Sequence, residues 1–107
     1  MRYITRYVIV AEMIRNFADR ESERVWGGRR SRRLPSEIQN VALRKLRMLN
    51  QAQVLTDLRV PPGNRLEALK GARTGQHSIR INQQWRIVFC WSDGQAHDVQ
   101  IIDYHRG

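Results

Sequence analysis

The sequence predicts one small α+β domain, with an N-terminal strand and two helices packed on an antiparallel sheet that ends in a three-stranded meander. A chain of 107 residues is too short to divide into separate cores. Its apolar residues recur at helical spacing between Leu34 and Leu49, and they alternate with polar residues from His77 onward. A helical period followed by a period of two is typical of helices that cover one face of a sheet.

The N-terminal part contains a short strand and a short helix. Ile14 to Phe17 alternates and predicts the strand, and Asp19 is a suitable N-cap for a helix over Arg20 to Trp26. Gly27 and Gly28 then end that helix. Because Met13 opens a self-sufficient pattern, residues 1–12 are either an upstream extension from an early start codon or an ordinary extra strand or turn. The domain itself is expected to span residues 13–107.

The second helix has the clearest pattern of the chain. The segment from Leu34 to Glu37 opens it, since proline is tolerated in a first helical turn. One apolar stripe is expected in the core, formed by Ile38, Val41, Ala42, Leu46 and Leu49. The opposite face is expected to be basic and solvated, with Arg44, Lys45 and Arg47.

The meander places its odd-numbered positions on the buried face. A turn over residues 82–84 puts Arg80 opposite Arg86 on the other face, and two facing guanidiniums repel each other unless an anion lies between them. For the next turn, hydrophobic matching favours a three-residue loop with Gly94 in the left-handed conformation, which brings Phe89 near His97 and Ile87 near Val99.

The charge of the chain indicates a polyanionic partner. Lys and Arg total 19 against 10 Asp and Glu, a net charge of +9, and 17 of the 19 are arginine by count. Guanidinium groups grip phosphates bidentately and stack on bases. Nucleic acid is favoured over a membrane surface because the basic residues do not gather on one amphipathic terminal helix, and no apolar run reaches the ~20 residues of a membrane span.

Cysteine and histidine argue against a disulfide or a metal centre. Cys90 stands alone, and the three histidines have no spacing typical of a metal pair, so no metal or cofactor is expected. A separate basic cluster follows the first helix, and it is either a solvated surface or a clamp on a phosphate backbone; it comprises Arg29, Arg30, Arg32 and Arg33.

Several side chains suited to RNA cleavage could converge beside the Arg80–Arg86 face. They are Glu67, Lys70, Arg86, Asp103, Tyr104 and His105. RNA can be cut without a metal because its own 2′-OH attacks the adjacent phosphate, if proton transfer and charge stabilisation are supplied. Each of these residues also has a simpler interpretation. Glu67 and Asp103 fit ordinary surface carboxylates, His105 fits a solvent-exposed histidine without a role, and Lys70 fits a turn residue.

The sequence blocks LPSEIQNVALRKLRMLNQA, LEALKG, GQHSIRINQQWRIVF and VQIIDYH resemble the HigB-type toxins of the RelE superfamily. The resemblance extends from Met13 to His105. It implies a RelE-like fold and a cytoplasmic endoribonuclease that cuts translated mRNA on the ribosome. It also implies a helix-turn-helix antitoxin of the HigA type, through which alone operator DNA is contacted.

The resemblance also implies roles for individual residues. The residues that match the family's active-site motifs are Lys70, Arg86, Asp103, Tyr104 and His105. Spacing and face parity, together with this likeness, make Arg73 and Arg80 further candidate RNA contacts. The arginines at 29–33 are candidate contacts with ribosomal RNA. Some relatives have a histidine where this chain has Glu67, so Glu67, Asp103 and His105 all remain candidates for the general base. Two alternatives share the fold: a ParE-like toxin that acts on DNA gyrase, and a ribosome-binding protein without catalysis.

Overall fold

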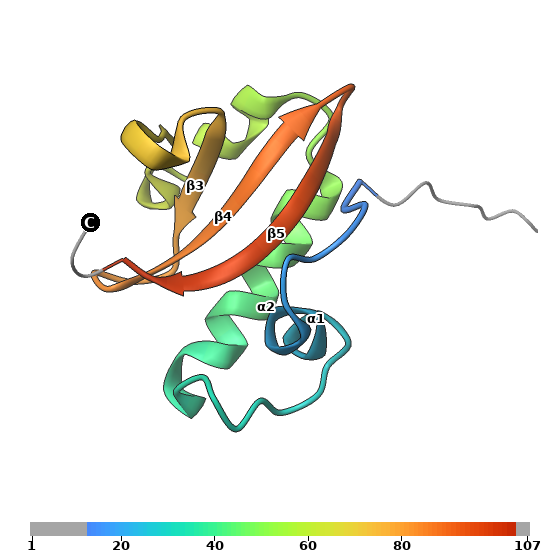
Figure 1. Ribbon diagram of the computed structural model, residues 1–107, viewed down its shortest axis with the longest axis vertical. Coiled ribbons are helices and arrows are strands. Elements are labelled where there is room, and N and C mark those ends of the chain that lie inside the picture. The colour runs from blue at the N-terminus through green and yellow to red at the C-terminus, as the bar shows by residue number, and fades with distance from the viewer. Residues whose placement is uncertain (1–12, 105–107) are drawn as a thin grey trace, which may run out of the picture.

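The computed structural model describes residues 13–104, and within them two helices cover one face of a four-stranded antiparallel sheet (Figure 1). The predicted extension over residues 1–12 and the candidate His105 lie outside the described residues. The helices are α1 (Arg20–Trp26) and α2 (Ser36–Gln51). The strands, in their order across the sheet, are β2 (Glu67–Ala68), β3 (Gln76–Arg80), β4 (Trp85–Ser92) and β5 (Gln95–Asp103). The α+β class and the closing meander are therefore confirmed, and β2 adds a short fourth strand.

In the N-terminal part the predicted helix forms, whereas the predicted strand is reduced to two bridges. The Asp19 carboxylate accepts a hydrogen bond of 2.7 Å from the Ser22 backbone N–H, so Asp19 caps α1 as predicted. The helix ends at Trp26, and Gly28 adopts a φ of +80° that favours glycine. The segment Ile14 to Phe17, predicted as a strand, forms no continuous ladder: it runs parallel to β5 and joins it at two isolated bridges, Ile14 with Ala96 and Phe17 with Val99.

Helix α2 buries the predicted apolar stripe, and two of the three residues of the predicted basic face, Arg44 and Arg47, are exposed as expected. Ile38, Ala42, Leu46 and Leu49 are buried, and Val41, the fifth residue of the stripe, is partly buried against the core. The expectation that Lys45 is solvated is wrong: its side chain is buried, and its ammonium donates a hydrogen bond to the Asn64 side chain. The helical period places Lys45 at the border of the stripe, where the 3₁₀ helix η3 (Pro62–Asn64) covers it.

The β4–β5 hairpin corrects a second expectation, because its turn has two residues and not three. Ser92 pairs with Gln95, and Asp93 and Gly94 have φ values of +54° and +72°, as in a type I′ turn. The extra residue lies inside β5 as a β-bulge at Asp98, whose φ is +52°. The bulge restores the hydrophobic match, so Ile87 faces Ile101 and not Val99.

The bulge also places His97 on the opposite face of the sheet from the one expected. With the two-residue turn His97 pairs with Cys90, on the face away from the helices, whereas the sequence placed it on the core side. The bulge is supported by Asn16, which donates to the Asp98 carboxylate at 2.8 Å and accepts from the Asp98 backbone N–H at 3.0 Å. Hydrophobic matching correctly required one extra residue between the paired positions, but that residue lies within β5 and not in the turn.

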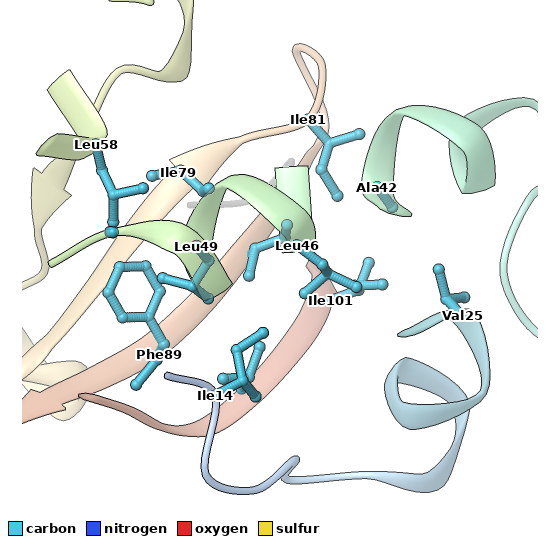
Figure 2. Close-up of a cluster of buried hydrophobic side chains, with 14 of the residues drawn as sticks. Ile14, Val25, Ala42, Leu46, Leu49, Leu58, Ile79, Ile81, Phe89 and Ile101 are labelled. Atoms are coloured by element: carbon cyan, nitrogen blue, oxygen red, sulfur yellow. The ribbon is translucent and has the colours of Figure 1, made fainter. Parts of the chain in front are cut away.

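The core fills the space between the helices and the odd-numbered face of the sheet. Figure 2 shows Leu46 and Leu49 of α2 packed between Ile79, Phe89 and Ile101 of the strands. Burial of each such side chain contributes about 1.5–3 kcal/mol. The even-numbered face carries the predicted Arg80–Arg86 pair, which the observed register confirms.

Candidate active site on the outer face of the sheet

Arg86 is the centre of the candidate site, and its guanidinium is buried although it carries a charge. It lies on the interior strand β4, and the residue is 8% exposed. Its Nε donates to Ser78 Oγ at 2.7 Å, and its Nη2 donates to the Arg65 carbonyl at 2.6 Å. A buried charge costs free energy unless it is hydrogen-bonded, and these two acceptors meet that requirement.

The charges around Arg86 are mixed. Burial lowers the pKa of Arg86. The neighbouring Glu67 and Tyr104 raise that pKa, whereas the cations Arg80 and Arg65 lower it further. A guanidinium nevertheless stays protonated in proteins. The site therefore holds a permanent, partly desolvated positive charge. Arg80 and Arg65 are close enough to interact electrostatically with it.

Glu67, Lys70 and Tyr104 border the same place. The three residues line one hollow on the surface, together with Ala68, Leu69 and Gly71. Arg86 adjoins this hollow through two of them: its Nη2 lies 3.3 Å from Glu67 Oε1, and its Cζ lies 5.7 Å from the centre of the Tyr104 ring. Four of the six predicted catalytic side chains thus come together.

The short strand β2 brings Glu67 to Arg86. Glu67 pairs with Ser78 of β3, and paired residues direct their side chains to the same face. Lys70 follows two residues after β2 and precedes the 3₁₀ helix η4 (Gly71–Arg73), which lies beside β3 (Figure 1). Tyr104 is fixed by its backbone N–H, which donates to the Gln84 carbonyl at 2.6 Å.

Asp103 lies apart from these four residues. It pairs with Trp85, on the odd-numbered side of the sheet, and its carboxylate accepts a hydrogen bond of 3.0 Å from Gln84 Nε2. Ile102, and not Asp103, is the β5 partner of Arg86. His105 follows directly after Tyr104 in the sequence and lies outside the described residues.

The two predicted RNA contacts nearest the site differ in their surroundings. Arg80 is directly opposite Arg86 across the β3–β4 ladder and is partly buried. Arg73 belongs to η4, and its Nη1 donates to Gln76 Oε1 at 3.1 Å. Arg80 therefore extends the positive charge of the site along the sheet.

The cluster of Arg29, Arg30, Arg32 and Arg33 lies elsewhere, in the loop between α1 and α2. All four side chains are exposed. In Figure 1 this loop lies at the end of the molecule opposite to β2 and η4. Arg29 and Arg30 line a second hollow with Val25, Gly28, Gln39, Asn40 and Leu43.

The loop that carries this cluster is held by buried side chains. Gln39 Oε1 accepts from the Ser31 backbone N–H, and Gln39 Nε2 donates to the carbonyls of Ser31 and Leu34, over distances of 2.8–3.1 Å. The Ser31 hydroxyl lies 2.6 Å from Glu21 Oε1 and also accepts from two backbone N–H groups of the loop. The four arginines thus extend from a fixed backbone, although the segment has no regular secondary structure.

Sequence reasoning missed Ser78 and Arg65, the two residues that hold Arg86. Ser78 is fully buried, and Arg65 contributes its backbone carbonyl. Face parity could have indicated Ser78, because it occupies an even position on the strand next to Arg86. Nothing in the local sequence indicated Arg65, which is 21 residues away in the chain.

The arrangement suits the binding of a phosphate ester. A partly desolvated guanidinium stabilises developing negative charge better than a solvated one. Lys70 adds an exposed ammonium, and Tyr104 adds an aromatic ring on which a base can stack. Among residues 13–104 no group of three or more His, Cys, Asp or Glu side chains is placed to hold a metal ion. Within the same residues, no helix is long and apolar enough to cross a bilayer.

These observations define a class: a small basic α+β protein with a buried arginine beside a surface hollow on the outer face of its sheet. The chain belongs to the HigB-like toxins, a family described as the RelE-like toxin of the type II toxin-antitoxin system HigB, which it matches over residues 15–105. Membership implies a cognate antitoxin as partner.

Individual relatives agree with this assignment. The chain is 52% identical over 68 residues to Toxin HigB-1 of Vibrio cholerae, an alignment that covers 64% of this chain and 72% of the relative. It is 32% identical over 69 residues to an uncharacterized protein of Haemophilus influenzae, covering 64% and 68%. It is 42% identical over 41 residues to the Endoribonuclease HigB of Proteus vulgaris, covering 38% and 45%.

Proposed function

We propose that the chain is a metal-independent endoribonuclease that cuts mRNA on the translating ribosome. The observation that carries the proposal is the position of the buried Arg86 guanidinium, beside the hollow lined by Glu67, Lys70 and Tyr104. The similarity to a relative named an endoribonuclease supports the reaction class.

The chemistry needs only the RNA and protein side chains. The 2′-hydroxyl gives up its proton and attacks the adjacent phosphorus, the bond to the 5′-oxygen breaks, and the leaving oxygen takes up a proton. The products are a 2′,3′-cyclic phosphate and a 5′-hydroxyl. Arg86 and Lys70 stabilise the charge on the pentacoordinate phosphorus, and Tyr104 stacks on or orients a base.

Proton transfer is assigned to His105. Of the three candidates, Glu67 is engaged by Arg86, and Asp103 lies on the other side of the sheet with Gln84. An imidazole also titrates near neutral pH, which suits general acid–base catalysis. Asp103 orients or activates a neighbouring group.

The remaining basic residues bind RNA in the proposal. Arg80 and Arg73 contact the substrate near the site, and the fixed cluster of Arg29, Arg30, Arg32 and Arg33 contacts the phosphates of ribosomal RNA. The net charge of +9 supports a large polyanion as partner. The protein then acts in the cytoplasm, and a helix-turn-helix antitoxin makes the contacts with operator DNA.

The test measures cleavage of a defined mRNA on programmed ribosomes. It compares the wild type with His105→Ala and Arg86→Ala. Arg59→Ala is the control for loss of an exposed charge. Wild type and control should give the same cut sites, and the two site variants should lose about 100-fold or more in rate. Full activity in both site variants would remove the assignment of the site.

Expression of the wild-type protein separates the proposed function from the alternative functions. Mapping of transcript 5′ ends after brief expression should show new ends within translated regions. Intact mRNA together with inhibited DNA supercoiling would indicate a gyrase-directed toxin instead. Intact mRNA with retained ribosome binding would indicate a binding protein without catalysis.

A further inference from the structure

The guanidinium of Arg86 is fixed at two points by neutral oxygen atoms. Ser78 Oγ accepts from Nε, and the carbonyl of Arg65 accepts from Nη2. We call this pair of acceptors the Arg86 anchor. Neither acceptor carries charge, so the anchor fixes the orientation of the group without neutralising it. Glu67, in contrast, meets the same Nη2 with a carboxylate that is 53% exposed.

Ser78 occupies a place where its hydroxyl has little freedom. It is 0% exposed on β3 and pairs with Val88, two positions along the ladder from the Arg80–Arg86 pair. Ser78 is therefore the diagonal neighbour of Arg86 on the same sheet face. At 2.7 Å, its oxygen makes a short bond to a charged donor in a buried region, where such bonds are strong.

The second acceptor depends on a tight turn. Arg65 has a left-handed backbone conformation, with φ +47° and ψ +57°, at the end of η3. The preceding Asn64 is fully buried, and its Nδ2 donates to the carbonyl of Leu58 at 3.1 Å. Its Oδ1 accepts from the buried Lys45 ammonium. The direction of the Arg65 carbonyl is thus set by a turn that is itself tied to α2.

We infer that Ser78 is a positioning residue for the cleavage reaction: with the Arg65 carbonyl it orients the Arg86 guanidinium toward the hollow that holds the scissile phosphate. The inference rests on the proposed function. Across the described residues, Nη1 is the guanidinium nitrogen with no protein acceptor, so it remains available to a phosphate oxygen. Stabilisation of a transition state requires such a donor to be in place before charge develops.

The first test measures the anchor without any reaction. In ¹⁵N NMR of the wild-type protein, the Arg86 Nε–H resonance is assigned by its loss in Arg86→Lys. We expect its exchange with water to be at least about tenfold slower than that of exposed arginines, because the donor is buried and bonded. Exchange as fast as that of the exposed arginines overturns the inference, and this measurement needs no Ser78 variant to fold.

The second test uses cleavage kinetics and a matched control. Ser78→Ala removes one buried hydroxyl near the site. Ser22→Ala removes another on the opposite side of the sheet, where Ser22 Oγ accepts from the Ile101 backbone N–H at 2.8 Å. Each variant loses one buried hydrogen bond, and urea unfolding of both measures the stability lost, so the control accounts for the general effect of that loss.

The expected result is a maximal cleavage rate about 10- to 100-fold lower for Ser78→Ala than for Ser22→Ala, with the half-saturating ribosome concentration unchanged. Ser78→Thr, which keeps the hydroxyl, should recover most of the rate. Equal rates for the two alanine variants overturn the inference. If the wild type cleaves no RNA, the proposed function fails, while the NMR measurement still reports whether the Arg86 Nε–H is held by a hydrogen bond in a buried place.

Discussion

The carboxylate of Glu67 lies 3.3 Å from Nη2 of Arg86, and this ion pair joins the shortest strand of the sheet to an interior one. The two side chains differ in exposure, 53% for Glu67 against 10% for Arg86. In the proposed mechanism an arriving phosphate would meet a fixed cation, while the exposed Glu67 carboxylate can turn into solvent. We therefore expect Glu67 to compete with the substrate for Arg86 rather than to serve as a base.

Glu67→Gln should separate these two roles. Removal of a half-exposed ionic partner should tighten ribosome-dependent RNA binding by about two- to fivefold and leave the maximal cleavage rate within about threefold of wild type. The measurement is the cleavage rate as a function of the concentration of programmed ribosomes. Gln84→Ala, which removes the partner of Asp103, is the control for a change at the other carboxylate. A loss of about 100-fold in rate for Glu67→Gln would instead make Glu67 the general base.

Neutralisation of the arginine cluster should weaken ribosome binding without harm to the fold. A variant with Arg29, Arg30, Arg32 and Arg33 changed to Gln loses exposed charges only, so its melting temperature should stay close to wild type. The slope of log affinity against log salt should fall by about 0.7–0.9 for each phosphate that the variant no longer neutralises. Binding is measured by sedimentation with ribosomes over a salt series. An Arg44→Gln/Arg47→Gln variant, on the exposed side of α2, should change the slope less, and an equal change would show that only net charge matters.

Gln39→Ala should release the same loop while leaving its charges in place. The substitution removes three hydrogen bonds to the loop backbone and should lower the free energy of unfolding by about 1–3 kcal/mol. Trypsin should then cleave after the arginines of the loop faster than in the wild type, as followed by mass spectrometry. The adjacent, exposed Asn40→Ala is the control. Unchanged cleavage would mean that Gln39 does not fix the loop.

Lys45 should make the stability of the protein depend on pH in the alkaline range. Burial, and to a lesser extent Arg44, lower the pKa of Lys45 below 10.5. Between the lowered pKa and 10.5 the unfolded chain binds more protons than the folded one, so the free energy of unfolding contributed by Lys45 rises with pH. Below that range the cost of burying the ammonium is present in full.

Urea unfolding of the wild type and Lys45→Met at several alkaline pH values measures this contribution. The difference in free energy of unfolding, wild type minus variant, should increase as pH rises toward 10.5. Lys70→Met, which removes an exposed lysine, serves as the reference for loss of one positive charge. A difference for Lys45→Met that is independent of pH would contradict the lowered pKa.

The sequence by itself determined the two helices, the three strands of the meander and the faces on which most of their residues lie. The change of period at His77 predicted the meander, Asp19 predicted the start of α1, and parity placed Arg80 opposite Arg86. These features depend on neighbours within a few residues, so a local pattern is sufficient to predict them. The resemblance of four sequence blocks to HigB-type toxins identified the family, which the match over residues 15–105 confirms.

Only the tertiary structure decided which side chains hold the site together. Arg65 reaches Arg86, Asn64 receives Lys45 and Asn16 supports the Asp98 bulge across 21, 19 and 82 residues of chain. Periodicity reports which face a residue occupies but not which distant segment covers it. Buried polar groups must find partners wherever the fold brings them, and those partners are set by packing that no local pattern contains.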